Sequence, residues 1–195
     1  MLAPAFDDPA LASQAAFRTV MEAMARPGRA RPLPSRLAAP PPLGATAAAV
    51  ALTLIDYETP FWLDQALAAA PEVAAWLEFH TGAPLTLDSG RAAFAFVSDP
   101  AAMPPFDTFS PGTLEYPDRS TTLVLQVARF GAGDALTLSG PGIQGTTSFS
   151  AQPLPPDFRT RLIANRETFP RGVDLILVSQ DAVAALPRSV RVAGG

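Results

Sequence analysis

Residues 121–127 read TTLVLQV, and residues 173–178 read VDLILV. Apolar runs that hardly alternate with polar side chains are typical of strands that are covered on both faces of a sheet. Shorter apolar runs at residues 92–97 and 189–192 predict two further strands. We therefore expect a sheet whose central strands are buried from both sides.

The segments that follow and separate these strands are rich in turn signals. Residues 135–138 predict one more strand, which the turn at residues 131–134 joins to the first strand as a hairpin. Residues 29–42 and 101–119 are crowded with proline and predict extended connections without helix.

The clearest helix is predicted for residues 9–26. Asp8 is a good N-cap, and Pro9 suits the first helical turn. Apolar side chains recur at helical spacing and form a stripe that we expect to pack in the core or in an interface: Phe17, Val20, Met21 and Met24.

Three further helices are predicted, for residues 45–56, for residues 72–80 and after Pro155 and Pro156. Helices that alternate with buried strands predict an α/β fold, with a layered mixed sheet and helices on both faces. No repeat or composition change divides the chain, so we expect residues 1–195 to form a single domain with an ordered core at about residues 6–192.

The composition excludes several kinds of chemistry. All 14 basic residues are arginine, cysteine is absent, and His80 is the single histidine. Without lysine there is no Schiff base to pyridoxal phosphate, and without cysteine there is no thiolate nucleophile or cysteine metal site. A Ser-His-Asp triad would need His80, which ends an apolar helix face and is interpreted as a core or capping residue. We expect no cofactor, no metal and no self-contained active site.

Charge and hydropathy restrict the location and the partners. The net charge of -4 argues against nucleic-acid binding. The longest apolar run, at residues 43–55, is shorter than the roughly 20 residues of a membrane-spanning helix. Asp7 and Asp8 stand where a signal peptide carries positive charge, so we expect a cytoplasmic protein without a membrane anchor.

Three loops carry candidate ligand groups, at residues 112–119, 139–143 and 169–172. Arginine offers a planar fork to phosphate, carboxylates accept hydrogen bonds from sugar hydroxyls, and a glycine loop can present N–H groups to an anion. The candidate residues are Glu115, Asp118, Arg119, Gly140, Gly142 and Arg171. In the alternative interpretation, Asp118 and Arg119 form an ion pair in a turn and the glycines only allow positive φ angles.

The order of six segments resembles the H subunit of the bacterial carbon-phosphorus lyase core complex. No segment is diagnostic alone, but the order and intervals are specific, and the resemblance extends over about residues 6–192. The segments are residues 6–28, 52–60, 112–119, 138–143, 169–175 and 186–188.

This resemblance implies a role in organic phosphonate catabolism. It implies a homodimer that assembles with the G, I and J subunits and supports transfer of a ribose triphosphate unit from ATP to methylphosphonate, which yields alpha-D-ribose 1-methylphosphonate 5-triphosphate. It also implies a fold similar to the large domain of pyridoxal-phosphate-dependent transferases. Because this chain has no lysine, such a fold would serve as a scaffold. The resemblance implies no catalytic residue.

Two hypotheses follow. In the first, the chain is a structural or assisting subunit whose apolar faces, at residues 10–24 or 45–55, dimerise and contact partners. In the second, it binds ATP or a phosphonate through Arg119, Arg171 and the glycine loops. Arginines that converge in one pocket would favour the second hypothesis. A free-standing hydrolase that uses His80 is a third, weaker alternative.

Overall fold

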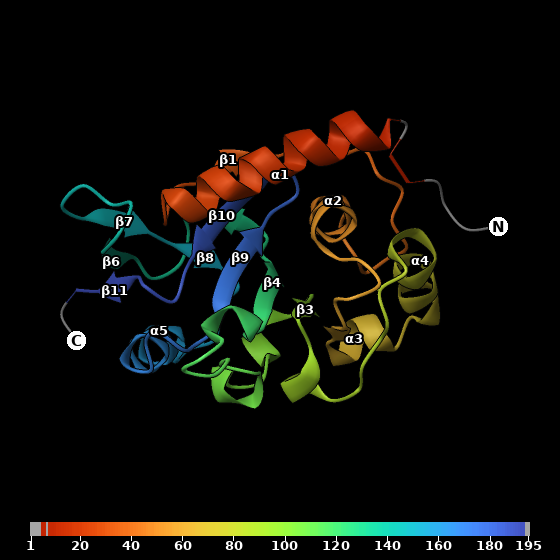
Figure 1. The fold of residues 1–195 in the computed structure, drawn as a ribbon. Helices are drawn as coiled ribbons and strands as arrows, with labels where there is room; N and C mark the ends of the chain where they lie inside the picture. Colours follow the sequence, from red (N-terminus) through yellow and green to blue (C-terminus); the bar gives the residue numbers. More distant parts are fainter. Residues whose placement is uncertain (1–4, 7, 194–195) are drawn as a thin grey trace.

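Six strands form the main sheet of the computed structural model, which describes residues 5, 6 and 8–193 (Figure 1). In spatial order the strands are β1 (Arg31–Pro32), β10 (Ala182–Leu186), β9 (Asp174–Val178), β4 (Thr122–Gln126), β3 (Phe94–Val97) and β2 (Phe61–Leu63). Strands β2, β3, β4 and β9 are parallel, β10 is antiparallel to β9, and β1 is antiparallel to β10. The predicted mixed sheet is confirmed.

The register of the central strands explains their apolar sequences. Val124 of β4 is paired with Phe96 of β3 and Ile176 of β9, and all three side chains belong to one core. The next residues along β4 and β9, Leu125 and Leu177, belong to the core on the other face. Because both faces are covered, successive residues on each strand are apolar, as the sequence predicted.

Four helices cover the first face of the sheet. Figure 1 shows α1 lying across β10 and β9, with α2 and α4 beside it. Their bounds are α1 Pro9–Ala25, α2 Ala45–Leu54, α3 Gln65–Ala68 and α4 Pro71–Thr81. Trp76 of α4 is fully buried in the core between this layer and the sheet. Among the described residues, no helix combines the length and the apolar character needed to cross a bilayer.

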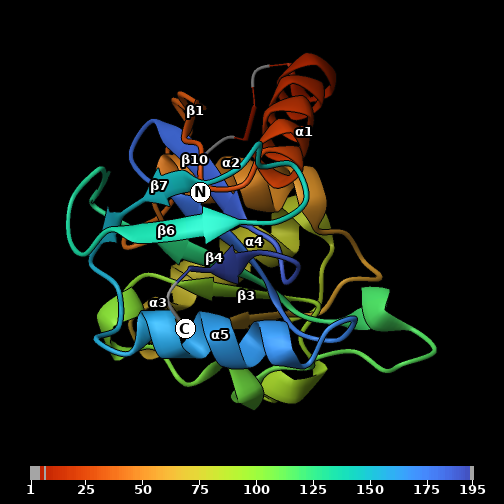
Figure 2. The same cartoon turned by 90° about the vertical axis from the view of Figure 1, so that its left-hand side faces the viewer.

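The second face is covered by α5 (Phe158–Glu167), by two small sheets and by short 3-10 helices; Figure 2 shows β6 and α5 in front of the main sheet. The small sheets are β11 (Arg191–Val192) with β6 (Leu136–Ser139) and β7 (Thr147–Phe149), and β5 (Arg129–Phe130) with β8 (Ala151–Gln152). The 3-10 helices are Ser89–Arg91, Pro100–Ala102, Phe106–Thr108 and Pro117–Arg119. Helices therefore lie on both faces, as predicted.

Helix α1 begins as predicted but buries only part of the predicted stripe, because Val20 and Met24 pack against the core and the other two residues do not. The Asp8 carboxylate accepts a hydrogen bond from the Leu11 N–H at 3.1 Å, which confirms the N-cap. Val20 is buried, whereas Phe17 and Met21 are 49% and 50% exposed. The helix faces α2 and β10 through Val20 and two alanines, Ala16 and Ala23. These small side chains allow close packing there, and the larger side chains of Phe17 and Met21 lie toward solvent.

The predicted hairpin between the first strand and residues 135–138 is wrong. Both edges of β4 are occupied by β3 and β9, so β6 pairs instead with β7 and β11. The strand predicted at residues 189–192 is shorter, Arg191–Val192, and belongs to this small sheet. Strand β10, which the sequence analysis missed, lies between β1 and β9.

Candidate functional site

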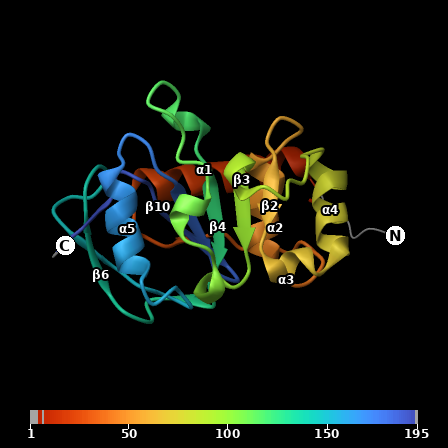
Figure 3. The ribbon, with the colours of Figure 1, turned by 90° about the horizontal axis from the view of Figure 1, so that it is seen from below.

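Most of the family-like segments meet at one edge of the main sheet, which we call the amino edge. The parallel strands β2, β4 and β9 begin there, and the antiparallel strand β10 ends there. The segments at residues 52–60, 112–119, 169–175 and 186–188 adjoin these strand ends. Figure 3 shows the loop before β4 projecting from the edge at which the arrows of β3 and β4 begin.

An open hollow of about 530 Å³ lies on the amino edge. Five of the six segments contribute to its lining, because residues 24–25, 117–118, 141–142, 169–170 and 187–188 all border it. These residues come from the end of α1, from three loops and from the turn after β10. The fold therefore brings together segments that lie far apart in the sequence.

A buried charge pair ties these segments to each other. The Arg188 guanidinium binds the Asp174 carboxylate through Nε, at 3.1 and 3.2 Å, and also through Nη2. The Arg188 backbone N–H donates to the same carboxylate at 2.8 Å. Nη1 of Arg188 donates to the Pro117 carbonyl, so one side chain joins β9, the turn after β10 and the 112–119 loop. Both side chains are about 85% buried, with 14% and 15% of their area exposed.

Sequence reasoning missed this pair as a site. Both residues lie inside segments that carry the family resemblance, but neither was selected as a candidate. The signal in the sequence was the acidic residue Asp174 at the start of a buried strand, where an unpaired carboxylate would be costly. Such a residue predicts a buried cationic partner, and Arg188 is that partner.

The two loop glycines occupy packing positions. Gly142 has a φ angle of +79°, and an added Cβ would lie 2.1 Å from the carbonyl oxygen of Ala25. A Cβ at Gly140 would lie 3.1 Å from the carbonyl oxygen of Ser189. The 139–143 loop thus rests directly on the end of α1 and on the turn after β10. Close packing accounts for both glycines.

The predicted ligand groups of the 112–119 loop are exposed. The Arg119 guanidinium lies over the Tyr116 ring, 4.2 Å from its centroid. Arg119 and Asp118 form no ion pair in the described part of the chain, so the pair expected in the turn is not formed. Glu115 is also exposed, and it does not border the hollow on the amino edge.

Arg171 lies apart from Arg119. It borders a separate hollow of about 350 Å³ beside α5, with Phe106 and Asp107 on another wall. Its loop is held by Asn165, whose side-chain amide donates to the Val173 carbonyl and whose Oδ1 accepts from the Val173 N–H. The structure therefore does not bring Arg119, Arg171 and the glycine loop into one pocket.

The opposite edge, where the parallel strands end, carries a further open hollow of about 530 Å³ beside Trp62, Asp64 and Met103, and polar side chains there make internal contacts. The Asp64 carboxylate accepts hydrogen bonds from the backbone N–H groups of Ser98 and Asp99, and Gln126 binds the backbone of Gly44. The parallel strands also follow each other in chain order, β2-β3-β4-β9, without the reversal that opens a ligand crevice in many α/β folds.

His80 is half-buried at the end of α4. Its ring lies 4.7 Å from the Trp76 ring and 5.0 Å from the Phe79 ring, measured between centroids. These contacts agree with its interpretation as a core or capping residue. Within the described residues, no group of three or more histidine, aspartate or glutamate side chains is placed to hold a metal ion.

Comparison with known proteins identifies the family. The model of the family described as "Bacterial phosphonate metabolism protein (PhnH)" matches residues 4–193. Alpha-D-ribose 1-methylphosphonate 5-triphosphate synthase subunit PhnH of Rhizobium meliloti (strain 1021) is 45% identical over 190 residues, which cover 96% of this chain and 94% of that protein. The putative C-P lyase subunit protein HtxG of Stutzerimonas stutzeri is 42% identical over 81 residues, 42% of each chain. This chain therefore belongs to the PhnH family of bacterial phosphonate metabolism proteins.

Proposed function

We propose that this chain is a structural or assisting subunit of the carbon-phosphorus lyase core complex. In that complex it supports formation of alpha-D-ribose 1-methylphosphonate 5-triphosphate, the activity named for the relative of 45% identity. The observation that carries the assisting role is the amino edge, where family-like segments are held together by the Arg188–Asp174 pair and the candidate arginines do not converge.

The amino edge also has the composition of a contact surface. Large apolar side chains stand exposed on its loops: Tyr57, Leu114, Tyr116 and Phe169. Exposed aromatic and apolar groups beside a hollow are typical of the centre of a protein–protein interface. We therefore assign this surface to contact with the other subunits.

The finer features of the family resemblance belong to the same proposal. We propose a homodimer in the cytoplasm that joins the G, I and J subunits of a transferase assembly. The mixed sheet with helices on both faces is compatible with a scaffold similar to the large domain of pyridoxal-phosphate-dependent transferases. We also propose that residues 1–195 form one domain, because both cores share one sheet. Such a domain is expected to unfold in one cooperative transition.

Co-purification with tagged G, I and J subunits tests the assignment of the amino edge. Leu114 is 73% exposed, so Leu114→Glu is expected to leave the fold intact and to reduce recovery of the assembly at least about tenfold, because a carboxylate would be buried in the interface. Ala75→Glu is the control, since Ala75 is exposed in the first half of α4, outside both the amino edge and α1. Equal recovery of both variants would contradict the assignment.

The exposed side of α1 that carries Phe17 and Met21 is the proposed dimer surface. The burial of most of α2 inside the fold supports the choice of α1 over residues 45–55. Met21→Glu is expected to convert the dimer to a monomer, measured as mass in solution by light scattering. Ala15→Glu, on another exposed side of α1, serves as the control. A Met21→Glu variant of unchanged mass would refute this dimer surface.

Direct ligand binding remains the second candidate function because Arg171 borders a mostly apolar hollow and has no ion pair among the described residues. For an assisting subunit, we expect the isolated chain to show no saturable binding of ATP or methylphosphonate in calorimetry. Binding that Arg171→Met abolishes, while Arg129→Met leaves it unchanged, would instead establish the ligand site.

A further inference from the structure

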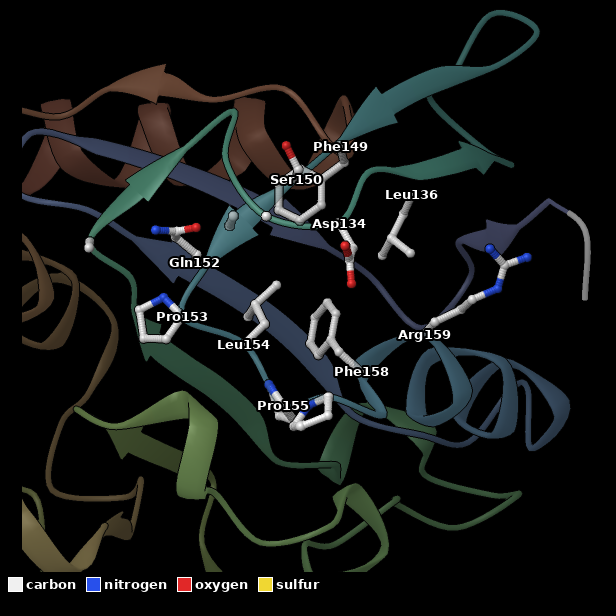
Figure 4. Close-up of a pocket in the computed structure, with 14 residues that line it drawn as sticks. Asp134, Leu136, Phe149, Ser150, Gln152, Pro153, Leu154, Pro155, Phe158 and Arg159 are labelled. Carbon is white, nitrogen blue, oxygen red and sulfur yellow. The ribbon is translucent and has the colours of Figure 1, made fainter.

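Another hollow, of about 420 Å³, lies between the small sheets and the start of α5 (Figure 4). Its walls include Leu136, Phe149 and Phe158, which are core side chains with 4–6% of their area exposed. Backbone hydrogen bonds hold its rim, since the Ala128 N–H donates to the Gln152 carbonyl at 2.8 Å. The hollow is therefore a preformed apolar pocket that reaches the core, as binding pockets commonly do. It shares no lining residue with the hollow on the amino edge.

One carboxylate is directed into this pocket. Asp134 precedes β6, and its side chain points into the space between Leu136 and Phe158 (Figure 4). Within the described part of the chain, no hydrogen bond or ion pair reaches that carboxylate. The other charged lining residue, Arg159, donates to the Ala193 carbonyl at 2.8 Å, and its guanidinium points away from Asp134 (Figure 4). The pocket thus combines apolar walls with an exposed carboxylate that no described group binds.

We propose that this pocket binds the side chain of an arginine from a partner polypeptide. An arginine has an apolar stem that can lie along the walls and a planar guanidinium that can form a two-point pair with Asp134. The side chains of Ser150 and Gln152 offer further acceptors for its five N–H groups. The negative net charge of the chain also favours a basic partner surface.

The guanidinium site is tested on the isolated chain, with N-acetyl-L-arginine amide as the probe and the uncharged N-acetyl-L-citrulline amide as its isostere. NMR titration is expected to shift the amide signals of Gly133 and Ser150 with the arginine probe, and citrulline is expected to bind at least about tenfold more weakly. Asp134→Asn is expected to weaken arginine binding by a similar factor, while Glu72→Gln, an exposed acid on α4, leaves it unchanged. Equal binding of both probes, or an unaffected Asp134→Asn variant, would overturn the site.

A second measurement tests the source of the arginine and rests on the proposed function. In the co-purified assembly, Asp134→Asn is expected to speed dissociation of the chain at least about tenfold, and Glu72→Gln is not. Unchanged dissociation would overturn the assignment to a partner polypeptide. A wild-type chain that forms no assembly would contradict the proposed function, and the probe titration would still decide whether the guanidinium site exists.

Discussion

Alanine at position 142 is expected to lower the free energy of unfolding by more than about 3 kcal/mol. A left-handed backbone costs an alanine about 1–2 kcal/mol, and the new Cβ would lie 2.1 Å from the Ala25 carbonyl oxygen. That distance cannot be accommodated unless the loop or the end of α1 moves. For a chain of this size the melting temperature should fall by about 6–12 °C or more, measured by differential scanning calorimetry.

Gly145→Ala separates the cost of a left-handed backbone from the cost of the close contact with α1. Gly145 lies in the same loop with a φ angle of +70°, but an added Cβ there would have no atom within 4 Å. Its expected cost is therefore only the backbone strain, about 1–2 kcal/mol. If both variants lose the same stability, close packing of the loop on α1 is not what the glycine provides. If Gly142→Ala also reduces assembly with partners, the position of this loop matters for the amino edge as well.

Local signals predicted several central elements but not all of them, and they did not predict the pairing of the strands. Asp8 and Pro9 start α1 as predicted, and the apolar runs of β4 and β9 are buried strands. Strand β10 was missed because AVAAL is rich in alanine, which has low strand propensity and acquires its conformation from neighbouring strands. The hairpin prediction failed because a turn signal does not show that both edges of β4 are already paired.

Residue type alone did not predict how the candidate residues lie relative to one another. Arg119 and Arg171 were selected because loop arginines bind phosphate, yet one stacks on Tyr116 and the other borders a separate hollow. Asp174 and Arg188 form the central contact of the amino edge, although 14 residues separate them. The antiparallel pairing of β9 with β10 brings them together, and that pairing was not predicted. The family-like segments meet at the amino edge, whereas the arginines that were selected by their chemistry do not converge in one pocket.

The Arg188–Asp174 pair is expected to be strongly coupled. Breaking a fully buried pair by removing one partner costs about 3–5 kcal/mol, and the 14–15% exposure of these side chains reduces the expected loss for Arg188→Met to about 2–4 kcal/mol. With Asp174→Asn and the double variant, chemical denaturation should give a coupling energy of about 1–3 kcal/mol.

The more exposed pair Asp157–Arg161 at the start of α5, in which Arg161 is 15% exposed and Asp157 is 57% exposed, provides the control. Because the Asp157 carboxylate is exposed, the cycle of Asp157→Asn and Arg161→Met should give a coupling of only about 0.3–0.5 kcal/mol. Arg188→Met should also release the Pro117 carbonyl, and hydrogen exchange at the amides of Thr113 and Arg119 should then accelerate. A coupling no larger than that of the more exposed pair, with unchanged exchange in the 112–119 loop, would show that this contact does not organise the amino edge.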